Sequence, residues 1–134
     1  MHKSFLITGS ISGALSVVLG AFGAHSLKKI VSPEALGAFE TGVRYQFYHT
    51  FALLLIAILY ERYRNKWLVR AGYSFVVGIA LFSGSLYILT ALNATHTVGL
   101  NGIGILTPFG GFFFIAGWLL MIAGVTGRRL QSYK

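Results

Sequence analysis

The sequence has 134 residues, of which 55% are hydrophobic and only 10% are charged, and it contains no cysteine. A soluble domain carries about 25% charged residues, so this composition excludes a soluble globular protein, and its high apolar content excludes a disordered one. The lack of cysteine excludes disulfides, thiolate metal sites and cysteine nucleophiles. At about 20 residues per span, the chain has room for four membrane spans in a single transmembrane domain over residues 1–134.

The first expected element is a span at about residues 4–26. Residues 4–27 contain no charged side chain, which is long enough to cross a bilayer core of about 30 Å. A cleavable signal peptide over residues 1–25 is the alternative. We prefer the span, because the apolar stretch exceeds the ~7–15 residues of a signal-peptide core.

The second expected span is at about residues 43–61. The uncharged stretch here, residues 45–60, is short for a span, so the helix must begin earlier, with Arg44 extending toward the headgroups. Residues 32–34 (Ser-Pro-Glu) form a helix start: a capping side chain, a proline at the first helical position and an acid near the positive end of the helix dipole. A short interfacial pre-helix over residues 33–41 is therefore predicted to lead into the span.

The last two expected spans share one uncharged stretch. Residues 71–127 carry no formal charge, which is too long for one helix and suits spans at about 70–91 and 107–127. Polar and helix-breaking residues place the connecting loop at about residues 92–107. The predicted fold is thus all-α: an integral membrane four-helix bundle with the pre-helix before its second span.

The basic residues predict how the bundle is oriented. With four spans, eight basic residues fall on the side that holds both termini, and three fall on the opposite side, at Lys28, Lys29 and Arg44. The positive-inside rule then places the N- and C-termini in the cytoplasm. The net charge of +8 is mostly this orientation signal, and nucleic-acid binding loses its support.

Small residues form stripes along two of the expected spans. In the first span the stripe is Gly9, Gly13, Ser16 and Gly20, and in the fourth it is Gly110, Gly117 and Gly124. Such stripes let helices approach closely. Packing inside the bundle is the preferred interpretation, and contact of one stripe with a second copy of the chain is the alternative.

Polar residues that are costly near a membrane gather toward the side opposite the termini, and such residues are candidates for function: His25, Glu40, Arg44, Tyr45, Gln46 and His49. Glu40 and Arg44 are four apart, in the order that favours an ion pair, but Arg44 could instead offer its planar fork to a lipid phosphate or a quinone oxygen. His49 is expected about one turn inside its span, flanked by Tyr45 and Gln46. A Glu40–His49 acid/base dyad is disfavoured, because nine residues place the two on opposite helix faces.

No cofactor and no catalytic residue is predicted. His25 and His49 could together ligate a haem or a transition metal, and His96 with Asn93 and Thr95 could complete a metal site. Membrane histidines more often hydrogen-bond between helices. The chain has no hydrolytic, phosphate-binding or dinucleotide-binding motif.

Four short motifs resemble a known family: Gly20-Ala-Phe-Gly-Ala-His25, Thr41-Gly-Val-Arg-Tyr-Gln46 followed by Tyr48-His49, Ser83-Gly-Ser-Leu-Tyr87 and Thr107-Pro-Phe-Gly-Gly111. Together they are similar to the domain of unknown function 423 family, small bacterial membrane proteins similar to eukaryotic transmembrane protein 256. The resemblance implies a compact four-helix protein of the bacterial plasma membrane with no established enzymatic activity, and it supplies no catalytic residues.

We therefore expect a multi-pass plasma-membrane protein that is not an enzyme and acts as a structural or interaction protein in membrane integrity. Its expected partners are membrane lipids, a second copy of itself or other membrane proteins, and not nucleic acid. The alternative is a binder of a lipid, quinone, haem or metal at the polar residues named above.

Overall fold

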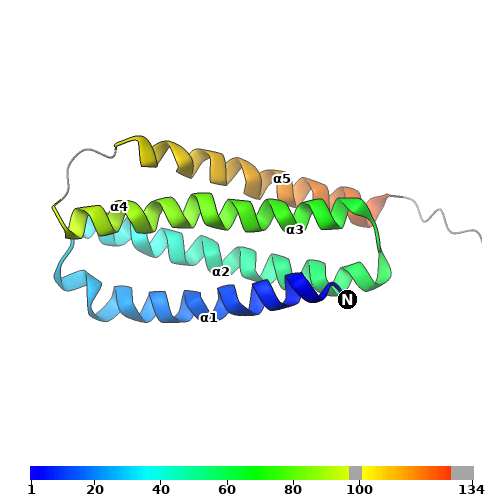
Figure 1. The fold of residues 1–134 in the computed structure, drawn as a ribbon, viewed down its shortest axis with the longest axis horizontal. Helices are drawn as coiled ribbons and strands as arrows, with labels where there is room; N and C mark the ends of the chain where they lie inside the picture. Colours follow the sequence, from blue (N-terminus) through cyan, green and yellow to red (C-terminus); the bar gives the residue numbers. More distant parts are fainter. Residues whose placement is uncertain (97–100, 128–134) are drawn as a thin grey trace, which may run out of the picture.

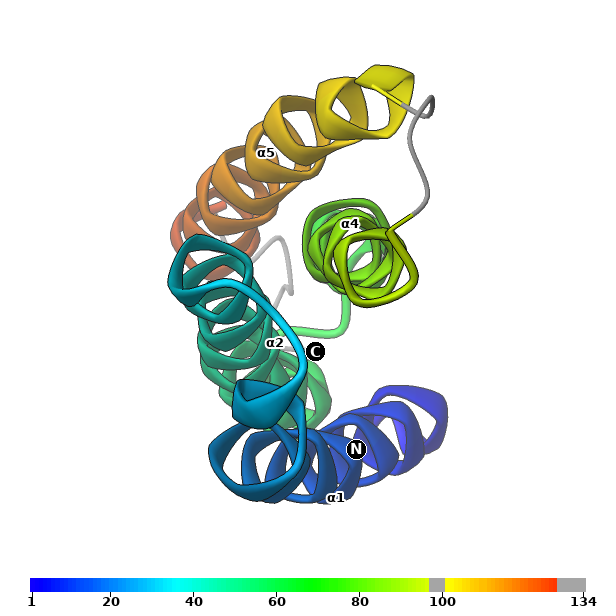
Figure 2. The same ribbon diagram turned by 90° about the vertical axis from the view of Figure 1, so that its left-hand side faces the viewer.

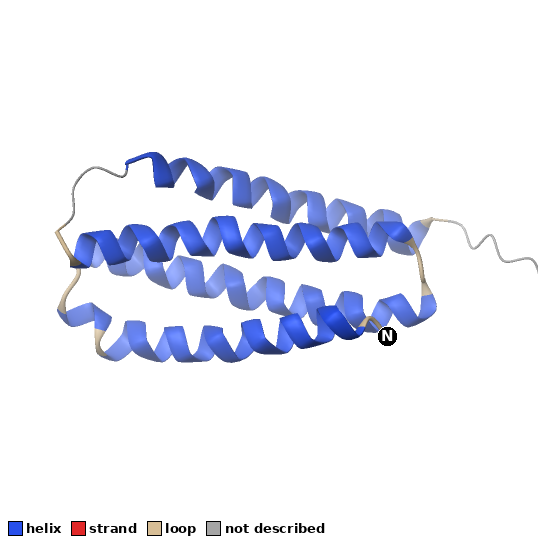
Figure 3. Cartoon of the chain, viewed as in Figure 1, coloured by secondary structure: helices blue, strands red, loops and turns tan. Residues whose placement is uncertain are grey.

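The computed structural model describes residues 1–96 and 101–127, and every regular element in these ranges is helical (Figures 1 and 3). The elements are α1 Lys3–His25, α2 Pro33–Arg62, α3 Lys66–Gly78, α4 Gly84–Ala94 and α5 Leu106–Thr126, with short 3₁₀ turns at Leu27–Lys29 and Asn101–Ile105. A π-helical turn, Ile79–Ser83, joins α3 to α4. The two therefore form one rod over Lys66–Ala94.

The chain makes four rods, each long and apolar enough to cross a membrane, which confirms the predicted four-helix membrane bundle. The N-terminus, the α2–α3 connection and the end of α5 lie together at one end of the bundle, which we call the N-terminal end; the α1–α2 connection lies at the far end (Figure 1). Viewed from the far end, α1, α2 and α5 form an arc with α4 on its inner side (Figure 2).

Helix α2 begins where the sequence predicts. The Ser32 hydroxyl accepts a hydrogen bond from the Ala35 backbone N–H at 3.2 Å, and Pro33 occupies the first turn. The helical segment expected over residues 33–41 runs into the second span without a break. The result is a single helix of 30 residues, about 45 Å long.

Rods α3–α4 and α5 pack with glycine against large side chains in one antiparallel register. Moving away from the N-terminal end, the contacts advance by seven, three and four residues on both rods: Gly124 with Leu68, Gly117 with Phe75, Phe114 with Gly78 and Gly110 with Phe82. A Cβ at Gly117 would lie 2.6 Å from the Phe75 ring, and one at Gly110 would collide with the Phe82 backbone. Only glycine allows this approach.

The stripe on α1 is also used inside the chain. A Cβ added at Gly13 would lie 3.2 Å from the Thr50 side chain of α2, and one added at Gly9 would lie 2.9 Å from the Leu54 side chain. The stripe on α5 and the Gly9–Gly13 part of the stripe on α1 therefore pack within the bundle.

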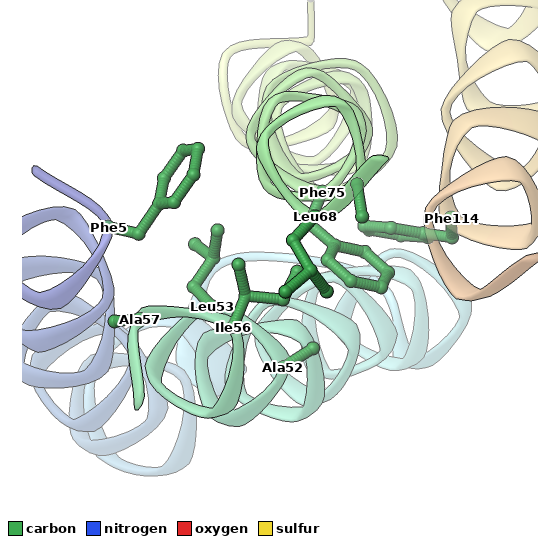
Figure 4. Packing of buried hydrophobic residues seen from close by; sticks show 9 residues of the cluster. Phe5, Ala52, Leu53, Ile56, Ala57, Leu68, Phe75 and Phe114 are labelled. Atoms are coloured by element: carbon green, nitrogen blue, oxygen red, sulfur yellow. The ribbon is translucent and has the colours of Figure 1, made fainter. Parts of the chain in front are cut away.

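A buried apolar cluster fills the half of the bundle nearer the N-terminal end (Figure 4). Its members come from all four rods: Phe5, Ala52, Leu53, Ile56, Ala57, Leu68, Ala71, Phe75 and Phe114. The half nearer the far end lacks this cluster, so its helices need other contacts.

We expect Gly110→Ala to destabilise the bundle by about 1–3 kcal/mol, because the new methyl group meets backbone atoms that cannot move aside. Gly111→Ala is the matched control, since its Cβ would lie 4.0 Å from Phe82 and alanine favours a helix by about 1 kcal/mol over glycine. Unfolding in mixed detergent micelles measures both. Equal stability of the two variants would contradict the close packing of α5.

Candidate functional site

The six candidate residues lie on two helices and face different neighbours. His25 ends α1, and the other five lie on α2. Glu40 and Arg44 face a groove shared with α1, Gln46 points into the bundle, and Tyr45 and His49 lie against aromatic rings of other rods. The structure therefore places the five α2 residues in three different surroundings and His25 apart from them.

Gln46 is at the centre of a buried hydrogen-bond network that joins three rods. Its Nε2 donates to the Ser12 carbonyl of α1 at 3.0 Å, and its Oε1 accepts from the Tyr87 hydroxyl of α4 at 2.8 Å. The Thr50 hydroxyl donates to the Ser12 hydroxyl at 2.9 Å, and the Ser16 hydroxyl donates to the Ser12 carbonyl at 2.9 Å. The side chain of Gln46 is thus bonded to the protein on both ends.

The π-helical turn carries a second set of polar contacts. The buried Ser83 hydroxyl donates to the Gly42 carbonyl of α2 at 2.7 Å. Ser85, just past the turn, shares a hydrogen bond of 2.7 Å with the Thr107 hydroxyl of α5. Ser83 and Ser85 therefore connect helices, which agrees with a packing role for this motif rather than a nucleophilic one.

His49 lies at mid-bundle. The sequence suggested a shallower position, about one turn inside the span. Its neighbour Thr50 faces Gly13, near the middle of α1, because α2 extends well beyond the uncharged stretch. Nδ1 of His49 donates to the Tyr45 carbonyl at 2.7 Å, and Nε2 accepts from Trp118 Nε1 at 3.4 Å. The ring stacks on Phe114, with 3.5 Å between centroids. Both ring nitrogens are therefore engaged within the chain.

The histidines do not meet. Gly13 of α1 is level with His49 of α2, and His25 lies twelve residues farther along α1. Twelve residues of helix span about 18 Å, so His25 and His49 are about this far apart along the bundle. The exposed His25 ring bonds to the Ala21 carbonyl of its own helix at 3.0 Å. His96 follows α4 with a φ of 53°, a backbone conformation common where helices end. Among the described residues, no three His, Asp or Glu side chains are grouped to hold a metal.

The loop around His96 is only partly described. The Asn93 side-chain oxygen accepts from the Ser32 backbone N–H at 3.2 Å, which ties the end of α4 to the start of α2. The side chain of Asn101 lies outside the described residues, as does part of the loop expected at 92–107.

The prediction of an ion pair between Glu40 and Arg44 is wrong. Within the described residues, the ion pair present joins the Met1 amino group to Glu61 at 3.7 Å. An exposed pair one helical turn apart gains only about 0.3–0.5 kcal/mol, so little holds these two side chains together. Both are exposed, and neither has a hydrogen-bond partner in the described part of the chain.

Glu40 and Arg44 instead border a groove between α1 and α2 with a volume of about 320 Å³. Its walls are mostly apolar, with Gly20 and Gly23 on the α1 side and Val43 and Phe47 on the α2 side. This volume lies at the lower end of the range of small-molecule sites. Glu40 and Arg44 are the candidate residues that line this groove.

Sequence reasoning missed three polar partners: Ser12, Thr50 and Tyr87. A polar side chain in an uncharged span must find a hydrogen bond, because lipid offers none, and this could have marked all three as interhelical. Which residues pair depends on the helix register, which the sequence does not give.

We expect Tyr87→Phe to destabilise the bundle by about 1 kcal/mol, because Gln46 Oε1 loses its buried donor. In a Gln46→Leu background the same change should cost much less, since the acceptor is already gone. Tyr73→Phe is the control, because Tyr73 is exposed on the same rod. Unfolding of the single and double variants gives the coupling, and additive effects would contradict the network.

Comparison with known proteins gives a consistent result. The family model described as "Protein of unknown function (DUF423)" matches residues 19–111. The chain is 40% identical to the UPF0382 inner membrane protein YgdD of Escherichia coli strain K12, over 91% of this chain and 88% of that protein. It is 39% identical to the UPF0382 membrane protein YwdK of Bacillus subtilis strain 168, over 90% and 94% of the two chains. No solved structure matches.

Proposed function

We propose, from the premise that this chain belongs to the DUF423 family of proteins of unknown function, that it acts as a non-enzymatic structural or interaction protein of the plasma membrane. Membrane residence is supported by four apolar rods and by relatives named as membrane proteins. The inner-membrane name of the Escherichia coli relative supports the plasma membrane of a bacterium as the location.

One observation carries this proposal: the buried polar side chains named above hydrogen-bond to side chains and backbone carbonyls of the chain itself. Gln46 and His49 are the buried polar side chains among the six candidate residues. Each has hydrogen-bond partners at both ends of its side chain. Neither side chain lines the groove between α1 and α2. Partners on neighbouring helices are what a structural clasp requires.

A role in membrane integrity is tested by replacement in a strain that lacks the gene. We expect loss of the gene to increase leakage of a membrane-impermeant dye under detergent stress. If the normal chain and His25→Ala restore low leakage and Gly110→Ala does not, the role depends on the packed bundle and not on a histidine ligand. Unchanged leakage without the gene would contradict the role.

We also propose that both termini face the cytoplasm. The N-terminus and the α2–α3 connection share one end of the bundle, and that end carries Lys3, Arg62, Arg64, Lys66 and Arg70. The far end carries Lys28, Lys29 and Arg44. This asymmetry supports the orientation by the positive-inside rule, and the basic residues after Gly127 lie outside the described residues.

Reporter fusions at the C-terminus test the orientation. A fluorescent protein that folds only in the cytoplasm should be bright, and alkaline phosphatase, which is active only outside, should be inactive. Fusions placed after Ile30 should give the reverse pattern and serve as the control. An active phosphatase at the C-terminus would overturn the proposed orientation.

A second candidate function is supported by the α1–α2 groove, which is apolar and bordered by two charged side chains without partners among the described residues. It is the binding of a membrane-soluble ligand there. The histidines do not support a haem or metal ligand, because they lie apart.

A further inference from the structure

We infer that the α1–α2 groove binds one phosphatidylethanolamine-type lipid, with its phosphate on Arg44, its ammonium on Glu40 and an acyl chain in the groove. This assignment deepens the second candidate function and rests on it, and it is independent of the role in membrane integrity. The occupant follows from the order of the charges, their depth and the shape of the groove.

The groove runs along the helix axes. Phe39 and Gly23 mark its end nearer the α1–α2 connection, and Phe47 and Val17 mark its deeper end. The eight-residue step from Phe39 to Phe47 corresponds to about 12 Å. A groove of this direction is parallel to the acyl chains of a bilayer crossed by the four rods, so a lipid tail can enter it without bending.

The charges lie at the depth of the headgroups. We take Tyr60, the last uncharged residue before Glu61, as one boundary of the hydrocarbon core. A core of about 30 Å takes about 20 residues of helix, so its other boundary lies near Glu40. Arg44 then lies about 6 Å inside that boundary. Helical side chains tilt toward the helix N-terminus, which for α2 is the far end, so the Arg44 guanidinium is directed toward the phosphates.

The order of the two charges matches a zwitterionic headgroup. In such a lipid the phosphate is nearer the bilayer centre, and the ammonium is farther out. Arg44 is one turn deeper than Glu40 on α2. A guanidinium binds phosphate through paired hydrogen bonds, and a carboxylate accepts hydrogen bonds from a primary ammonium. A choline headgroup has no N–H to donate, and a glycerol headgroup has no cation.

The walls suit one hydrocarbon chain. Gly20 leaves the α1 wall open: a Cβ added there would lie 3.7 Å from Val43, in ordinary contact, so the space beyond it belongs to the groove and not to helix packing. Val17 and Phe47 are both exposed and supply apolar surface at the deeper end. A leucine at position 20 would therefore place its side chain at the groove, with its Cβ in ordinary contact with Val43.

Native mass spectrometry tests the inference. Protein purified in mild detergent is mixed with equal amounts of palmitoyl-oleoyl phosphatidylethanolamine, phosphatidylglycerol and phosphatidylcholine. We expect the normal chain to retain one phosphatidylethanolamine in preference to the others. Arg44→Gln should lower retention of this lipid about tenfold, as loss of a charge-assisted hydrogen bond predicts, and Gly20→Leu should abolish it. Glu40→Gln should keep a bound phospholipid but lose the preference for ethanolamine.

Lys29→Gln is the matched control, because it removes a positive charge at the same end of the bundle from an exposed side chain outside the groove. Helical content and melting temperature confirm that each variant is folded. Equal retention of the three lipids by the normal chain, a preference for phosphatidylglycerol, or unchanged retention in folded Arg44→Gln and Gly20→Leu would each overturn the inference. Dye leakage restored by Arg44→Gln in the strain lacking the gene would leave the role in membrane integrity standing.

Discussion

The close approach of α5 to the α3–α4 rod, glycine against large side chain, is the contact on which the rest of the bundle depends. Water drives apolar helices together in a soluble protein, but lipid does not, so packing and hydrogen bonds must do so here. The register set by Gly124 at one end and Gly110 at the other brings Ser85 within 2.7 Å of Thr107 and lays Phe114 against His49. The hydrogen bond between Ser85 and Thr107 exists because these two backbones are close.

The two halves of the bundle are held together by different contacts. Near the N-terminal end, the apolar cluster around Phe75 fills the space between the rods (Figure 4). From mid-bundle toward the far end, polar contacts replace it: the network around Gln46 joins α1, α2 and α4, and Asn93 accepts a hydrogen bond from the Ser32 N–H. Between them the π-helical turn lies against Gly42 on one side and Gly110 on the other. The buried polar residues thus connect helices, whereas Glu40 and Arg44 have no partner in the described part of the chain.

The sequence predicted the four rods, the start of α2 at Ser32 and the use of small residues in helix contacts, because hydropathy, capping chemistry and residue size are local properties. It did not predict which polar residues pair, since Gln46 and Tyr87 meet only in one register of two helices. It placed His49 too near the surface, because the uncharged stretch marks neither end of α2. The spacing of Glu40 and Arg44 permitted an ion pair, but spacing alone could not show that a groove lies beside them.

An experimental structure of the protein in nanodiscs that contain phosphatidylethanolamine tests the central claim most directly, namely that the mid-bundle polar groups are structural and the groove charges hold a ligand. We expect phospholipid density along Val17 and Phe47 with its headgroup between Arg44 and Glu40, and direct protein contacts around Gln46 and His49. Density for a haem, metal or other ligand on His49, with an empty groove, would contradict it.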